Sequence, residues 1–144
     1  MPIRIFALAF VMLCSLLGGC GNQDDPQAAL EAAVQQLQDN LEAKKNSAVL
    51  EQLHPQFSAQ GEFDRDWAQR TMLLLFMRHK NIKVLALSKD SYLDANYREK
   101  GHTAAQVGLA GAEGLIPDSA RHYSVKMEWW LENHQWQLAR LSWQ

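Results

Sequence analysis

The spacing of apolar residues is helical in the first part of the chain. Asp25-Pro26 supplies an N-cap acceptor and a first-turn proline, the usual start of a helix. Four apolar residues then recur at intervals of four, three and four: Leu30, Val34, Leu37 and Leu41. The pattern predicts an amphipathic helix over residues 26–44, with one face buried.

Two further helices are expected before the period changes. AVLEQLH forms a short helix between a capping Ser47 and Pro55, which ends it. Asp64 or Asp66 caps a third helix that runs through WAQRTMLLLFMRHK. Because its apolar residues surround much of the helix, we expect this helix to be the most buried of the three.

From Ile82 onward apolar and polar residues alternate, which predicts strands. The expected strands span 82–88, with 91–97 as a continuation or a second strand, then 102–111, 122–131 and 136–143. Strict alternation places Trp129 and Trp130 on opposite faces, and likewise Trp136 and Trp143. Three N-terminal helices on one face of a curved antiparallel sheet of about four strands define an α+β domain over 26–144.

The segment before this domain has the features of an export signal. A single cation, Arg4, precedes an uncharged apolar run that is too short to span a bilayer comfortably, which takes about 20 residues. The run ends in small residues directly before Cys20, and the sequence then turns polar. We therefore expect residues 1–19 to be a signal peptide and residues 20–25 a short tether.

Leu17-Gly18-Gly19-Cys20 resembles the lipobox of bacterial lipoproteins. The resemblance implies cleavage between Gly19 and Cys20, and lipidation of the Cys20 thiol and the new amino terminus. Acyl chains anchor a protein because each buried methylene contributes about 0.8 kcal/mol. An ordinary signal peptide with an incidental cysteine is the alternative. An Asp directly after the lipidated cysteine retains such lipoproteins at the inner membrane, and this chain has Gly21 at that position. We therefore expect an outer-membrane protein facing the periplasm.

Cysteine content and charge exclude several classes of function. Cys14 lies in the expected signal peptide and Cys20 in the expected anchor, so the mature domain has neither a disulfide nor a cysteine zinc site. The chain has 14 basic and 16 acidic residues, which does not favour a nucleic-acid surface. The histidines form no HExxH pattern, and structural or surface roles are expected for all five: His54, His79, His102, His122 and His134. No metal or other cofactor is expected.

The order of elements resembles the nuclear transport factor 2-like, or cystatin-like, superfamily. The resemblance is carried by the long first helix, the short second helix with AVLEQLHPQF, and a closing hairpin over HYSVKMEWWLENHQWQLARLSWQ. It implies helices and a curved sheet around a cone-shaped pocket. The superfamily includes enzymes, carrier domains and binding domains, so the fold does not decide the function.

Two sets of residues are candidates for function inside such a pocket. Enzymes of this class often use an Asp or a His at the pocket mouth, and the candidates here are Asp118 and His122, with Asp94 as a third. A turn or capping role is the alternative for Asp118. Six residues could line the pocket or fill it as core: Trp67, Phe76, Met77, Tyr123, Met127 and Trp129.

The leading hypothesis is a lipid-anchored periplasmic domain that binds a protein partner or a small ligand without catalysis. One alternative is a small acid–base enzyme, isomerase- or dehydratase-like, and another is an accessory protein of envelope assembly. Trp130 lies on an otherwise polar sheet face, which favours contact with a second copy or with another envelope protein. Cover by the chain's own loops would equally explain Trp130.

Overall fold

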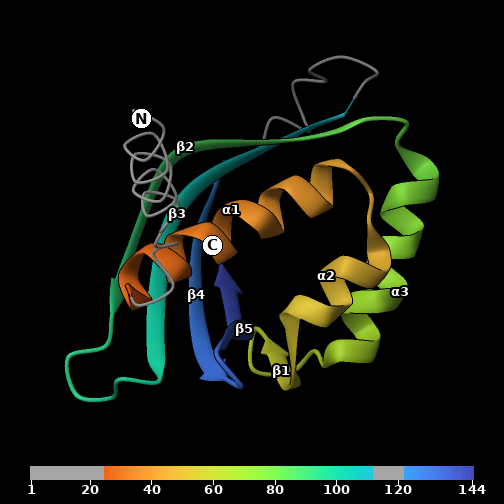
Figure 1. The fold of residues 1–144 in the computed structure, drawn as a ribbon. Helices are drawn as coiled ribbons and strands as arrows, with labels where there is room; N and C mark the ends of the chain where they lie inside the picture. Colours follow the sequence, from red (N-terminus) through yellow and green to blue (C-terminus); the bar gives the residue numbers. More distant parts are fainter. Residues whose placement is uncertain (1–24, 112–121) are drawn as a thin grey trace, which may run out of the picture.

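The computed structural model describes residues 25–111 and 122–144, which form one curved sheet and three helices (Figure 1). The elements in chain order are α1 (Pro26–Glu42), α2 (Asn46–Gln52), β1 (Leu53–Ala59), α3 (Arg65–Arg78), β2 (Ile82–Leu93), β3 (Lys100–Gly111), β4 (His122–Glu132) and β5 (Gln135–Trp143). The sheet order is β1-β5-β4-β3-β2. Helix α1 lies across the concave face, and α2 and α3 lie beside β1 (Figure 1). The predicted α+β class is confirmed.

The sheet has five strands, and the prediction of three helices followed by about four antiparallel strands is wrong in this respect. Strand β1 lies between α2 and α3, where a helix end and a loop were expected, and it pairs in parallel with β5. Helix α2 ends at Gln52, so Pro55 lies inside β1 rather than after a helix. A proline is tolerated there because β1 is an edge strand.

A bulge in β5 changes which face its tryptophans occupy. The register with β4 shifts between Glu128↔Arg140 and Trp129↔Leu138, which leaves Ala139 as an extra residue. Trp136 and Trp143 therefore both pack on the core side, and the expectation that they face opposite sides is wrong. The alternation predicted for β4 holds, since it has no bulge.

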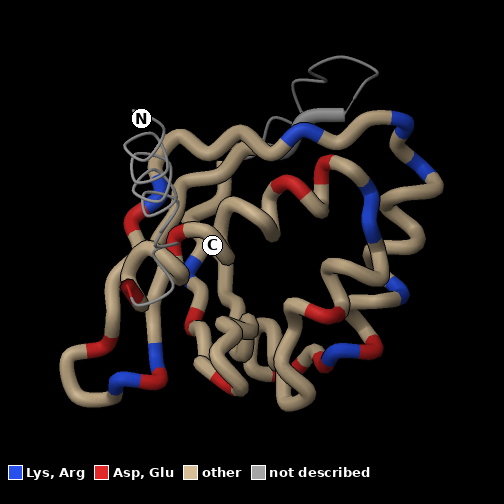
Figure 2. Tube along the Cα trace, in the orientation of Figure 1, with Lys and Arg blue, Asp and Glu red and all other residues tan. Residues whose placement is uncertain are grey.

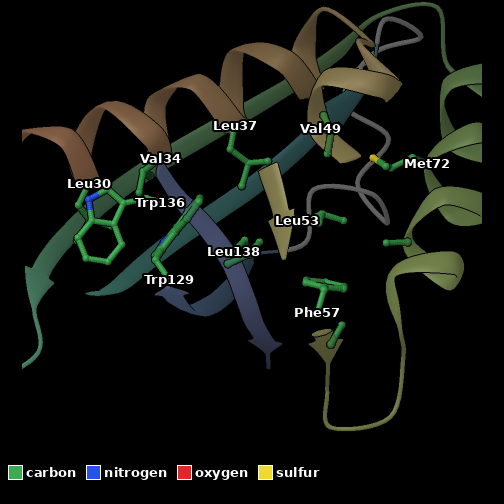
Figure 3. Close-up of a cluster of buried hydrophobic side chains, with 12 residues drawn as sticks. Leu30, Val34, Leu37, Val49, Leu53, Phe57, Met72, Trp129, Trp136 and Leu138 are labelled. Carbon is green, nitrogen blue, oxygen red and sulfur yellow. The ribbon is translucent and has the colours of Figure 1, made fainter. Parts of the chain in front are cut away.

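The core lies between α1 and the concave face of the sheet. Trp129 is fully buried, and its indole Nε1 donates to Thr103 Oγ1 at 3.2 Å. Leu30 of α1, also fully buried, lies directly over Gly101 of β3. Figure 3 shows Trp129 and Leu138 on the side of the sheet that α1 covers.

Side chains of α1 also cover the free edge of β2. Gln27 Nε2 donates to the Ser91 carbonyl at 2.6 Å, and Gln38 Nε2 donates to the Val84 carbonyl at 3.0 Å. Glu42 Oε1 accepts from the Val84 backbone N–H at 3.2 Å. Three backbone groups on this open edge are thus satisfied, and these bonds hold α1 along β2. The helix is positioned there to form one wall of a cavity.

Candidate ligand-binding cavity

A cavity of about 420 Å³ lies between α1, α3 and the concave face of the sheet. This volume lies within the roughly 300–1,000 Å³ that is usual for small-molecule sites. Helix α1 contributes Val34, Leu37, Gln38 and Leu41, α3 contributes Trp67 and Leu75, and the sheet supplies Val84, Ala86, Lys89, Ala105, Val107, Tyr123, Val125, Met127, Leu138, Leu141 and Trp143. Most of these side chains are apolar, so the cavity suits an apolar ligand.

Aromatic rings brace the side of the cavity where α3 meets β5. Trp67 stacks on Trp143 with centroids 6.3 Å apart, and Phe63 stacks on Trp67 at 4.6 Å. Asp64 begins α3 as its N-cap and accepts from the Trp67 backbone N–H at 2.9 Å. The cap therefore fixes the turn that presents Trp67, and stacked rings add rigidity to this wall.

The six predicted pocket residues are divided between three environments. Trp67, Tyr123 and Met127 lie in the cavity wall. Phe76 packs against the core cluster, and Trp129 lies deep within it. Met77 is 76% exposed and lies outside the cavity.

Helix α3 buries a narrower face than its composition suggests. Only Ala68 and Met72 are buried, whereas Leu73, Leu74 and Leu75 are 42–50% exposed. The expectation that α3 is the most buried helix is wrong, because α3 flanks the sheet beside β1 rather than crossing it (Figure 1). Of these exposed leucines, Leu75 contributes to the cavity wall.

The described cavity wall contains no carboxylate and no imidazole. His122 is exposed at the first position of β4, where alternation directs it away from the face of Tyr123. Asp118 lies outside the described residues. Among the described lining residues, Lys89 carries the only charge.

Asp94 and His102 form a pair on the convex face of the sheet, away from the cavity. His102 Nε2 lies 2.7 Å from Asp94 Oδ2, and Asp94 Oδ1 accepts from the backbone N–H groups of Asn96 and Tyr97. The hydrogen bond to His102, helped by the two backbone donors, lowers the pKa of Asp94 to about 2. These bonds order the turn between β2 and β3, which is a structural role.

Trp130 also lies on the convex face, where it is half-buried. Its Nε1 donates to Glu128 Oε1 at 2.7 Å, and the Arg140 guanidinium lies 4.8 Å from its ring centroid. His54, expected at a helix end, lies buried in β1, where its ring meets Trp130 edge-on and its Nε2 bonds Glu132 Oε1 at 2.8 Å. Contacts within the chain therefore cover part of the Trp130 ring, and its predicted role at an interface stays a prediction.

A metal-binding cluster and a membrane-spanning helix are both absent from the described part of the chain. No group of three or more His, Cys, Asp or Glu side chains is placed there to hold a metal ion. No helix among residues 25–111 and 122–144 is long and apolar enough to cross a membrane. Basic and acidic positions are interspersed along the described trace (Figure 2). A second pocket, of about 430 Å³, has polar lining residues that include His102, Lys126 and Glu128, whereas the cavity between α1, α3 and the sheet is lined mainly by apolar side chains.

No protein-family model matches the sequence, and no curated protein matches it. Similarity is found with solved structures. A nuclear transport factor 2-like protein of unknown function from Pseudomonas putida KT2440 matches with a TM-score of 0.69 and 5% identity, over 81% of this chain and 84% of that one. This similarity supports the nuclear transport factor 2-like fold that the sequence resembled.

Two other solved structures share this fold. A hexachlorocyclohexane dehydrochlorinase from Novosphingobium barchaimii LL02 matches with a TM-score of 0.62 and 10% identity, over 81% of this chain and 84% of that one. Bd1075 of Bdellovibrio bacteriovorus matches with a TM-score of 0.67 and 11% identity, over 79% of this chain. The matched region spans only 38% of Bd1075. At such identities the similarity shows the fold alone.

Proposed function

We propose that this protein is a non-catalytic binding protein of the bacterial cell envelope, and that its ligand is a small molecule whose apolar part is held in the cavity. The observation that carries the proposal is the character of the cavity wall. About 420 Å³ of space is lined mainly by aliphatic and aromatic side chains, with only a few polar groups among the described residues. Burial of apolar ligand surface there would contribute roughly 25 cal/mol per Å² before the costs of association.

The acid–base enzyme alternative is less favoured by the same wall. A general base must lie within hydrogen-bond reach of the proton that it abstracts, and no described lining residue is an Asp, a Glu or a His. The dehydrochlorinase shares the fold with this chain, and its name describes that protein only. The third hypothesis, a role in envelope assembly, would use the convex face and Trp130 instead.

The experiment tests the proposal by placing larger side chains in the cavity wall. Ala105 is buried in the wall, whereas its neighbour Ala104 is exposed on the opposite face of β3. The full chain is placed in lipid nanodiscs and exposed to a photoactivatable analogue of dodecanol. We expect the label to attach to cavity residues, and Ala105→Phe to weaken apparent affinity at least tenfold, or about 1.4 kcal/mol.

Ala104→Phe is the matched control and should bind the probe as the wild type does. Thermal melting shows whether each variant is folded, and Ala86→Phe, from the half-buried wall on β2, provides a second obstruction if Ala105→Phe unfolds. Labelling that spreads over the convex face, or that is unchanged in folded wall variants, would contradict the proposal.

We also propose that the domain is anchored by lipid at Cys20, after cleavage between Gly19 and Cys20, in the outer membrane facing the periplasm. The lipobox-like Leu17–Cys20 segment supports the anchor, and Gly21 supports the destination. Metabolic labelling with a fatty acid should mark the wild type and leave Cys20→Ser completely unlabelled. Label retained by Cys20→Ser would contradict the anchor, and fractionation with the inner membrane would contradict the destination.

A further inference from the structure

The charge at the boundary of the cavity identifies the kind of ligand that would fit. Lys89 lies on the concave side of β2 at the bulge that follows Ala86, and it contributes to the cavity wall while remaining exposed to solvent. Lys89 therefore lies at the boundary between the apolar cavity and the solvent. A ligand with an alkyl chain inside the cavity would place its polar end at such a boundary.

Two glutamines of α1 hold the Lys89 ammonium in place. Nζ donates to Gln35 Oε1 at 2.6 Å and to Gln38 Oε1 at 3.1 Å. An ammonium has three donors, so one remains for a ligand. No described carboxylate lies within ion-pair distance of Lys89. The positive charge is therefore held by neutral oxygens only.

The amide nitrogens of these glutamines are already engaged, which fixes the direction of their oxygens. Gln38 Nε2 donates to the Val84 carbonyl and to Glu42 Oε1, and Gln35 Nε2 donates to Asp39 Oδ1. Gln35 thus bonds both Asp39 and Lys89, and Gln38 bonds both Glu42 and Lys89. Neither Asp39 nor Glu42 lines the cavity. What a bound ligand meets at this boundary is the ammonium.

We infer that the ligand is a single-chain amphiphile with a carboxylate head, of the fatty-acid class. This inference rests on the proposed binding function. The alkyl chain occupies the apolar cavity, and the carboxylate accepts the remaining Lys89 donor in a charge-assisted hydrogen bond. An uncharged alcohol of the same chain length would fill the cavity equally well but would lack the ion pair.

The test compares photoactivatable analogues of dodecanoate and dodecanol on the full chain in nanodiscs, at a pH of about 8, where a carboxyl with an ordinary pKa of about 4.3 is ionised. Because Lys89 is exposed, we expect a preference for dodecanoate of only about three- to tenfold. Lys89→Met should abolish this preference, because it weakens binding of the dodecanoate analogue more than binding of the dodecanol analogue. Raised salt should reduce the preference in the wild type.

Lys83→Met is the matched control, because Lys83 is an exposed lysine of the same strand and lies outside the cavity wall. It should keep the wild-type preference, and Lys89→Arg should retain most of it. Equal binding of the two probes to the wild type, or a preference that survives in folded Lys89→Met, would overturn the carboxylate inference alone. Failure of both probes to label the cavity would instead overturn the proposed binding function.

Discussion

Replacement of Trp129 by Ala is expected to lower the free energy of unfolding by about 3–5 kcal/mol. The Trp129 side chain is fully buried between α1 and the sheet, and its removal leaves a cavity that neighbouring strands cannot close. Its hydrogen bond to Thr103 is lost as well, although Thr103 Oγ1 keeps a partner in Ser91 Oγ at 2.9 Å. Denaturant unfolding followed by circular dichroism measures the change.

The neighbouring residue provides the control for this prediction. Trp130→Ala removes a side chain of the same size from the convex face, where it is only half-buried. Its contacts with Arg140 and Glu128 are partly exposed, so we expect a loss of about 1–2 kcal/mol. Equal losses for the two variants would show that the convex face carries as much of the stability as the core does.

Substitution of Gly101 by Ala is expected to destabilise the protein by about 1–3 kcal/mol, although it adds a single methyl group. A Cβ atom at this position would lie 2.6 Å from Leu30 Cδ2. A leucine side chain can usually change rotamer to avoid such a contact. Leu30, however, is fully buried between α1 and the sheet, so it has little space to move. The helix would have to move away from β3, and the same unfolding assay measures the cost.

Gly108 of the same strand is the matched control. A Cβ atom there would meet its nearest neighbour, Leu85 Cβ, at 3.8 Å, an ordinary contact distance. Gly108→Ala should therefore be neutral or stabilise the protein by about 0.4–1 kcal/mol, because alanine restricts the unfolded chain. Similar destabilisation by both variants would mean that contact with Leu30 does not explain the effect at Gly101.

Regular periodicity made much of the fold predictable from the sequence. The stripe from Leu30 to Leu41 and the cap at Asp25 predicted α1 nearly to its observed bounds, and Asp25 Oδ1 accepts from two first-turn N–H groups. In β4 the alternation was unbroken, so the residues on its core side could be named. Such patterns are local, and local physics is sufficient to explain them.

The errors occurred where tertiary contacts override local preference. LHPQFSA alternates between apolar and polar residues, but Pro55 was interpreted as the end of a helix, and the segment forms a strand by pairing in parallel with β5. The bulge at Ala139 leaves no mark in the sequence, yet it moves Trp143 into the cavity wall. Helix α3 is rich in leucine and methionine but flanks the sheet, so composition overstated its burial.

The candidate site was predictable only in part for the same reason. Trp67, Tyr123 and Met127 follow from aromatic and methionine positions on elements that were recognised. Lys89 and Gln38 looked like ordinary surface residues in the sequence. Their significance depends on the bulge after Ala86 and on the path of α1 along β2, which only the three-dimensional structure reveals.

The parallel pairing of β1 with β5 has a consequence for how the chain matures. Leu53 pairs with Leu138, so β1, the first strand of the described sheet, finds its partner only in β5. Contacts so distant in sequence slow folding, because a long loop must close before they form. A nascent or prematurely terminated chain would therefore leave β1, with Phe57, exposed to chaperones and proteases. The described sheet can therefore close only after β5 has been synthesised.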